Sequence, residues 1–184
     1  RPGQSALTTA RREADRVRFL SGLMAYDTES KELAPLTPDT DRAVALGTPI
    51  GFIVENADHR SVDYDRLKNV YRPSHADYAW QQRYGLRDWR GGGRSSGRET
   101  ISRVVAGALA MQMLDLSGIS ISSRIAALGD LTDPAKEQIE QAVADAKADA
   151  DSLGGIVECT IAGVPAGVGE PVFGKLQQSL ASAM

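Results

Sequence analysis

The stretch of residues 71–100 constrains this chain more than any other, because it places three consecutive glycines just before a helix-like segment. The glycines at 91–93 allow a positive φ and a close approach of a ligand to the backbone. Ser95 and Ser96 follow where an N-cap belongs, since residues 98–110 have the pattern of a helix. Free N–H groups at a helix N-terminus, serine hydroxyls and flanking arginines together favour an anion. The sequence therefore predicts a phosphate-binding turn in this stretch.

A histidine lies in the same stretch, next to an Arg-Pro turn. Residues 76–84 predict a helix, and Gly85 is a suitable residue to end it. His75 is then expected at or just before the N-terminus of that helix. A lone histidine is more often structural or simply exposed than catalytic, but Arg72 and Asp77 nearby favour a catalytic role. Both interpretations stay open from the residues alone.

The charge distribution favours a small anion as the partner. The chain has 184 residues and a net charge of −3, so it is not expected to bind nucleic acid. Between residues 60 and 98, however, nine Lys and Arg residues face four Asp and Glu residues. Such a local positive field suits a small anion better than a polymer. Aromatic residues among these arginines leave RNA as a weaker alternative.

Several classes of protein are disfavoured by what the sequence lacks. It contains no run of eighteen apolar residues, so no membrane span is expected. Cys159 is the single cysteine; it suits a reducing compartment, which predicts a cytoplasmic protein, and its apolar neighbours predict a buried position. The two histidines, His59 and His75, form no metal-ligand motif, so no metal site is expected. Walker A, Rossmann and Gly-x-Ser-x-Gly motifs do not occur.

Hydrophobic patterning predicts alternating strands and helices in a single domain over residues 1–184. The expected strands are 16–23, 48–56, 119–128 and 156–162. The expected helices are 61–70, 76–84, 98–113, one capped at Asp133-Pro134 and running to 151, and one starting at Glu170-Pro171. The helix over 98–113 is apolar nearly all round and is therefore expected to be buried. Residues 26–45 carry prolines and acidic residues, which predict a flexible insertion loop.

Three longer segments resemble one known family. They are Arg-Pro-Ser-His-Ala-Asp-Tyr at 72–78, Gln-Arg-Tyr-Gly-Leu-Arg-Asp-Trp-Arg-Gly-Gly-Gly-Arg-Ser-Ser-Gly-Arg-Glu-Thr at 82–100, and Gly-Val-Pro-Ala-Gly-Val-Gly-Glu-Pro-Val-Phe at 163–173. Shorter matches follow the same order at residues 1–5, 8–13, 20–22, 47–51 and 60–64. Together they resemble chorismate synthase along nearly the whole chain.

The resemblance implies a fold and a reaction. The fold would be α+β, with helices packed against antiparallel sheets in a β-α-β sandwich of which this sequence holds an incomplete part. The protein would form a homotetramer. It would convert 5-enolpyruvylshikimate 3-phosphate to chorismate and phosphate by a 1,4-anti elimination. Reduced FMN would be required without net redox change, with NADPH as a candidate reductant of the flavin.

The resemblance also implies roles for individual residues. His75 would protonate the reduced flavin. The flavin-binding turn would consist of Arg94, Ser95 and Ser96. The substrate anions would be held by three arginines, Arg12, Arg72 and Arg98. Several arginines suit this substrate, because one guanidinium cannot neutralise a phosphate and two carboxylates.

The sequence also departs from the family pattern. The family's Gly-Glu-Ser-His-Gly motif, which carries a second histidine, does not occur here, and neither does its C-terminal part with a catalytic aspartate. Ser74 stands where the family usually has glycine. Two hypotheses follow. The chain represents an active lyase, or it is a catalytically incomplete core that folds and binds anions or self-associates without turnover.

Overall fold

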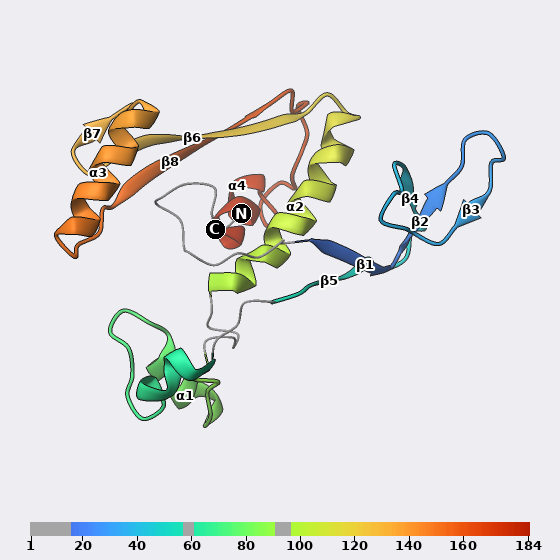
Figure 1. Cartoon of the computed structure of the whole chain (residues 1–184). Helices are drawn as coiled ribbons and strands as arrows, with labels where there is room; N and C mark the ends of the chain where they lie inside the picture. The colour runs from blue at the N-terminus through green and yellow to red at the C-terminus, as the bar shows by residue number, and fades with distance from the viewer. Residues whose placement is uncertain (1–15, 57–60, 91–96) are drawn as a thin grey trace. The chain divides into compact units, whose positions relative to one another are not determined.

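The computed structural model describes residues 16–56, 61–90 and 97–184 (Figure 1). These residues form helices and several small sheets in which every strand pair is antiparallel, which confirms the expected α+β class. The chain divides into two compact units, Arg1–Thr100 and Ile101–Met184. That residues 1–184 form one domain stays a prediction.

The first unit contains two small sheets. Its strands are β1 (Val17–Ser21), β2 (Leu23–Tyr26), β3 (Leu33–Ala34), β4 (Ala43–Ala45) and β5 (Gly51–Val54). β1 pairs with β5, and the rings of Phe19 and Phe52 meet edge to face with centroids 6.5 Å apart. The second sheet has the order β3-β2-β4. The strand expected at 16–23 is therefore two strands, separated at Gly22, whose φ of 81° breaks the extended chain.

The sequence patterning missed the strands within residues 26–45. Both β3 and β4 pair with β2. Between β2 and β3, the Asp27 carboxylate accepts the backbone N–H groups of Glu29 at 2.8 Å and Ser30 at 3.3 Å, which stabilises a tight turn. Short strands beside prolines give too little alternation to be found in the sequence. The flexibility of this segment stays a prediction.

Three helical segments follow in the first unit: η1 (Ser61–Leu67), α1 (Asp77–Tyr84) and η2 (Gly97–Glu99). The expected C-terminus of α1 is confirmed. Gly85 has a φ of 74°, and its N–H donates to the carbonyl of Gln81 at 2.9 Å. This places Asp77 in the first turn of α1 and the 72–76 turn just ahead of it.

The second unit is built on one long antiparallel pair. Its elements are α2 (Thr100–Asp115), β6 (Ser120–Leu128), β7 (Leu131–Thr132), α3 (Lys136–Ala148), β8 (Gly155–Ala162) and α4 (Leu176–Ala183). The sheet has the order β7-β6-β8, and the β6–β8 ladder runs from Ser120–Ala162 to Leu128–Gly155. Figure 1 shows α3 beside the β7 end of this sheet. The expected strands at 119–128 and 156–162 are confirmed within a residue.

Two expected helix starts were wrong. Asp133 does not cap α3, whose N-cap is Ala135; Asp133 has a φ of 46° and pairs instead with Arg124 of β6. The Ala135 N–H is satisfied by the Gln138 side chain at 2.8 Å. The last helix does not start at Glu170-Pro171, because Val172 has a φ of 68° and belongs to a turn. It starts at Leu176.

The expected burial of α2 and of Cys159 was also wrong. On α2, Val105 is buried, whereas Val104 and Met113 are 66% and 71% exposed. Cys159 lies on β8 and is exposed. β8 pairs with β6 along one edge, and pairing through the backbone does not cover the faces of a strand. An apolar pattern identifies residues that favour burial, but burial itself requires a second surface.

The turn after β8 depends on a glycine. Gly163 has a φ of 78°, and a Cβ at this position would overlap the carbonyl oxygen of Gly118. Gly118 has a φ of 73°, but a Cβ there would meet nothing within 4 Å. A side chain would therefore strain the backbone at both positions, but only at Gly163 would it also overlap a neighbouring atom.

We expect Gly163→Ala to lower the free energy of unfolding more than Gly118→Ala. The matched control should lose about 1–2 kcal/mol from the left-handed backbone alone, and Gly163→Ala about 1–3 kcal/mol more from the overlap. Urea unfolding followed by circular dichroism measures both. Equal losses would show that the close approach of residues 118 and 163 is not maintained in solution.

Candidate functional site

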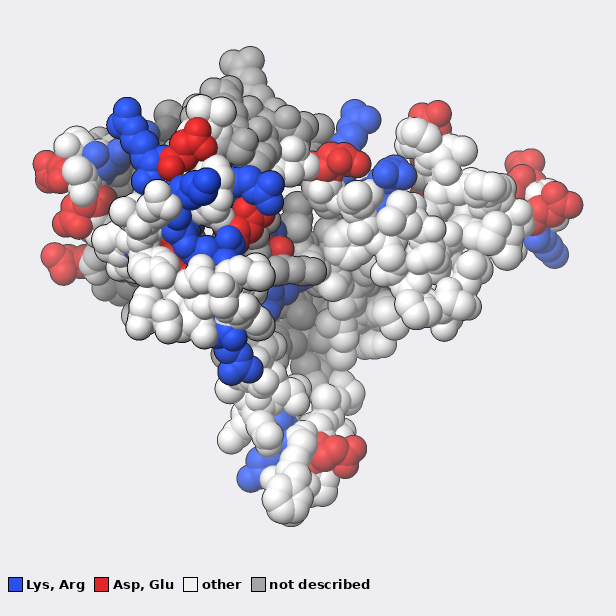
Figure 2. Space-filling view, turned by 90° about the horizontal axis from the view of Figure 1, so that it is seen from below, with Lys and Arg blue, Asp and Glu red and all other residues white. Residues whose placement is uncertain are grey.

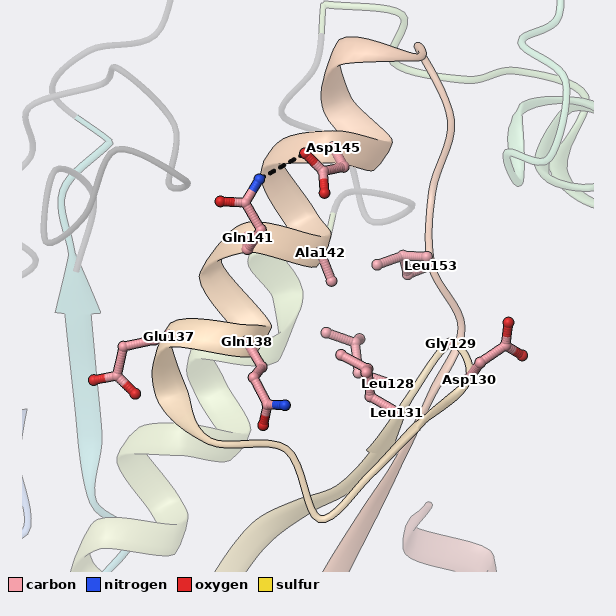
Figure 3. A pocket seen from close by; sticks show the side chains of 10 residues that line it. All are labelled: Leu128, Gly129, Asp130, Leu131, Glu137, Gln138, Gln141, Ala142, Asp145 and Leu153. Atoms are coloured by element: carbon pink, nitrogen blue, oxygen red, sulfur yellow. Dashed lines mark hydrogen bonds between the residues drawn. The ribbon is translucent and has the colours of Figure 1, made fainter.

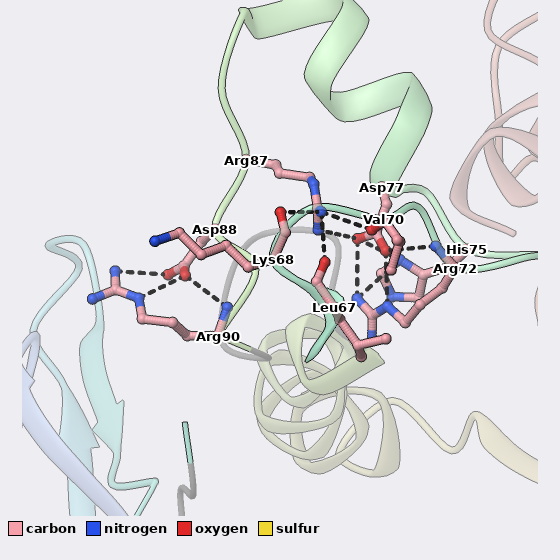
Figure 4. Close-up of polar contacts among 9 residues, drawn as sticks. All are labelled: Leu67, Lys68, Val70, Arg72, His75, Asp77, Arg87, Asp88 and Arg90. Carbon is pink, nitrogen blue, oxygen red and sulfur yellow. Dashed lines mark hydrogen bonds and ion pairs between the residues drawn. The ribbon is translucent and has the colours of Figure 1, made fainter. Parts of the chain in front are cut away.

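A buried carboxylate organises the segment around α1 (Figure 4). Asp77 is 1% exposed and is the only fully buried charged side chain among the described residues. It lies in the first turn of α1, where the helix dipole favours a negative charge. A buried charge is tolerated only when it is paired and hydrogen-bonded, so the groups around Asp77 define the site.

Arg72 is the main partner of Asp77. Its Nε lies 2.8 Å from Oδ2 and its Nη2 3.0 Å from Oδ1, a two-pronged pair, and its backbone N–H also donates to Oδ2 at 3.2 Å. The Arg72 side chain holds the pKa of Asp77 well below its ordinary value of 3.8. Burial acts in the opposite direction, while the Arg72 N–H and the charges of Arg72 and His75 lower the pKa further.

Arg87 encloses the carboxylate from the other side. Its side chain is 7% exposed, and its Nη1 lies 3.6 Å from Oδ1 of Asp77. Its Nη2 donates to the carbonyl oxygens of Leu67 at 2.8 Å, Lys68 at 3.0 Å and Val70 at 2.8 Å. One guanidinium therefore joins the chain after η1 to the residue that starts α1.

His75 stands at the edge of this cluster. Its Nδ1 lies 3.0 Å from Oδ1 of Asp77 and 3.2 Å from Nη2 of Arg72, and its side chain is 26% exposed. The preceding Ser74 has a φ of 55°, in the region that favours glycine. This conformation is one that the glycine expected from the family pattern would adopt without strain. The turn therefore holds His75 through contacts at Nδ1, while its side chain remains partly exposed.

Aromatic rings and further charges surround the cluster. Tyr71 and Tyr78 meet edge to face with centroids 5.4 Å apart, and the guanidinium of Arg87 lies 5.3 Å from the Tyr71 ring centroid. Arg72 lies 6.0 Å from the ring centroid of Tyr64. Figure 2 shows Lys and Arg gathered, with Asp and Glu among them, over the part of the first unit that holds η1 and α1. Cations beside apolar ring surface suit a ligand that is both aromatic and anionic.

The structure brings two of the predicted site residues together, His75 and Arg72. Arg98 lies in η2, where its Nη1 donates to Oδ1 of Asn56 at 2.7 Å. Four others fall outside the described residues: Arg12, Arg94, Ser95 and Ser96. The roles of all seven stay predictions. Sequence reasoning noted Asp77 only as a neighbour of His75 and missed Arg87; an acidic residue two positions after the histidine was the available signal.

The described part of the chain offers little else that resembles a reactive centre. It contains no group of three or more His, Cys, Asp and Glu that could hold a metal ion, and no helix long and apolar enough to cross a membrane. A hollow of about 570 Å³ lies in the second unit between α3 and the β6–β7 turn (Figure 3). Leu128, Leu131 and Leu153 form its apolar side.

Removing the Arg87 side chain should destabilise the first unit. Arg87→Ala leaves three carbonyl oxygens without their donor and the Asp77 carboxylate with one cation fewer, which should cost about 3 kcal/mol. Arg90→Ala is the matched control, because Arg90 pairs with the partly exposed Asp88 and is itself 59% exposed. Its effect should be small. Chemical denaturation compares the two variants. Equal stability of both would contradict the role of Arg87 in joining the chain after η1 to Asp77.

The lowered pKa of Asp77 predicts acid sensitivity. Because its folded pKa lies below 3.8, the unfolded chain binds more protons in the window between the two values. The stabilisation is complete above that window, declines as the pH falls below 3.8, and disappears as the pH passes the folded pKa. The difference in unfolding free energy between wild type and Asp77→Asn should therefore shrink below about pH 4.

Denaturant titrations between about pH 2 and 6 measure this difference. Asp88→Asn is the control for the loss of one negative charge from the same unit, at a carboxylate that is 35% exposed. A wild-type advantage over Asp77→Asn that stays constant to the lowest pH would contradict the lowered pKa.

Comparison with known proteins extends the match to the whole chain. The family model described as "Chorismate synthase" matches residues 1–184. Proteins named chorismate synthase from Phocaeicola vulgatus, Bacteroides thetaiotaomicron and Flavobacterium psychrophilum are 44%, 45% and 41% identical to it. Each alignment covers 100% of this chain and 53% of the relative, so the chain spans about half the length of these relatives. The chain therefore belongs to the chorismate synthase family.

Proposed function

We propose that this chain provides the histidine-bearing part of a chorismate synthase, a lyase that eliminates phosphate from 5-enolpyruvylshikimate 3-phosphate to give chorismate. The observation that carries the proposal is the state of His75. It belongs to the segment that resembles the family motif, and its ring is held from behind by buried Asp77 and remains partly exposed. A group that must give and take a proton needs both a fixed orientation and access.

The described residues fit a reduced FMN cofactor in their chemistry. His75 belongs to the same short segment as the aromatic pair Tyr71 and Tyr78. The guanidinium groups of Arg72 and Arg87 both contact Asp77, which His75 also contacts. Within the proposal, Arg94, Ser95 and Ser96 hold the flavin through the glycine-rich turn. When bound, reduced FMN supplies the electron that the elimination needs without net redox change. His75 holds a proton for delivery on the flavin side of the site.

The arginines divide the anionic substrate among them in this proposal. Arg12 and Arg98 contact its phosphate and carboxylate groups. Arg72 has a double role, because Nε and Nη2 hold Asp77 and leave Nη1 for a substrate anion. A 1,4-anti elimination breaks the carbon–oxygen bond to phosphate and one carbon–hydrogen bond on the opposite face. Cations around the departing phosphate stabilise the charge that develops on it.

The remaining properties of the family are part of the same proposal. The active protein is a homotetramer, and NADPH is a candidate reductant of its flavin. The cytoplasmic location expected from the sequence stays a prediction. The alternative, a core that folds and binds anions without turnover, is separated from the proposal by experiment.

The test replaces the matching segment of the Bacteroides thetaiotaomicron chorismate synthase with this chain. The chimera and the 184-residue chain are assayed anaerobically with chemically reduced FMN and 5-enolpyruvylshikimate 3-phosphate, following chorismate. We expect the chimera to form chorismate and His75→Ala in the chimera to lose about 100-fold or more of the rate. Lys136→Ala, at a side chain 82% exposed in the second unit, is the control.

Each outcome decides something. A folded chimera that binds FMN without forming chorismate overturns the proposed function. Full activity of the His75→Ala chimera overturns the role of His75. Activity in the chimera but not in the 184-residue chain supports the function for this segment and assigns the chain by itself to the core hypothesis.

A further inference from the structure

The contacts of His75 raise a question that its position in the motif does not answer. An imidazole has two nitrogens, and in the neutral ring one carries the proton while the other is bare. Which nitrogen is bare decides where the ring can accept a proton. In this structure Nδ1 has two close neighbours of opposite character, Oδ1 of Asp77 at 3.0 Å and Nη2 of Arg72 at 3.2 Å.

The two neighbours require opposite tautomers. An ionised carboxylate can only accept a hydrogen bond, so the contact with Asp77 requires a proton on Nδ1. A guanidinium can only donate, so a hydrogen bond from Arg72 requires a bare Nδ1 and a proton on Nε2. Both hydrogen bonds cannot exist in one ring at the same time.

The geometry favours the carboxylate. A bare Nδ1 would place its lone pair 3.0 Å from an oxygen of a buried anion, which is repulsive. Nη2 of Arg72 already donates to the same carboxylate oxygen at 3.0 Å, so it does not depend on the histidine for a partner. The lowered pKa of Asp77 means that this oxygen remains an anionic acceptor at neutral pH.

We infer that Asp77 is a positioning residue, which fixes His75 in the tautomer with the proton on Nδ1 and leaves Nε2 as the nitrogen that exchanges protons. Among the described residues, Nε2 has no hydrogen-bond partner, and the side chain is partly exposed. Asp77 is itself held by Arg72 and Arg87. The catalytic meaning of this inference rests on the proposed function, but the tautomer does not.

The inference also explains why Arg72, His75 and Asp77 lie so close together in the sequence. Residues 72 to 77 bring an arginine, a histidine and an aspartate to one point within six positions, with Ser74 in a left-handed conformation between them. The arginine neutralises the carboxylate, and the carboxylate orients the imidazole. An amide in place of the carboxylate removes the negative charge and one acceptor oxygen, and a non-polar side chain removes the acceptor altogether. In both cases the nearby guanidinium then favours the other tautomer.

The test observes the ring directly. Long-range ¹H–¹⁵N correlation spectra of the full 184-residue chain, at about pH 9 where imidazole is neutral, distinguish a protonated from a bare nitrogen. The chain has two histidines, so His59→Gln assigns the His75 signals. We expect Nδ1 protonated and Nε2 bare in the wild type. A wild-type ring with its proton on Nε2 overturns the inference, whatever the variants do.

Two substitutions test the cause. Asp77→Asn should shift His75 toward the tautomer with the proton on Nε2, and Asp88→Asn, at the partly exposed carboxylate that pairs with Arg90, should leave both ring nitrogens unchanged. If Asp77→Asn fails to fold, Asp77→Glu keeps the charge and displaces the carboxylate, and the His75 signals should move. Because the amide oxygen in Asp77→Asn can still accept a hydrogen bond, Asp77→Ala is measured as well. Unchanged His75 nitrogens in a folded Asp77→Ala overturn the inference.

In the part of the chain that the structure describes, few other charged or titratable side chains contact the Asp77–His75 pair or Arg72. Arg72, Arg87 and Tyr64 are the charged and titratable side chains for which contacts with Asp77 or Arg72 are known in the described residues. In the chimera, Asp77→Asn should also lower chorismate formation by about 100-fold with FMN binding retained. A shifted tautomer with no change in rate would support Asp77 as the residue that positions the ring and would reject the proposed use of Nε2 in catalysis.

Discussion

The buried charge of Asp77 is the constraint on which the described site depends. A carboxylate that is 1% exposed destabilises a fold unless cations and donors surround it. Here that requirement recruits Arg72 from the preceding turn and Arg87 from the segment after α1. Arg87 in turn joins the chain that leaves η1. A single negative charge thus fixes the relative positions of three consecutive segments.

This arrangement explains how the His75 side chain can be both oriented and accessible. The Asp77 carboxylate contacts Nδ1 of the His75 ring, and the side chain is 26% exposed within the part of the chain that the structure describes. The cost of burying the charge is offset by the pairing with Arg72, which also lowers the pKa of Asp77. A buried ion pair is weak evidence for stability by itself. Its clearer effect in this protein is to orient the imidazole ring of His75.

The second unit follows a different principle. The β6–β8 ladder provides backbone hydrogen bonds over its whole length, but β8 remains exposed along the same length. Apolar side chains such as Ile156 and Val157 are 62% and 69% exposed. A strand can therefore be fully paired through its backbone while its side chains remain exposed. The strand pattern was visible in the sequence because β-branched and small residues alternate there, whereas the covering of the strand is a property of surfaces beyond it.

The sequence by itself determined the local features of this protein. Gly85 predicts the end of α1, alternation predicts β6 and β8, and the motif around His75 indicates the family. Local signals suffice for these features, because turn conformation and strand alternation depend on neighbours in the chain. The sequence could not find the start of α3, because Asp133 pairs with Arg124 of β6 rather than capping the helix. It also could not identify Arg87, nor choose the partner of His75, because those contacts join residues that only the tertiary structure brings together.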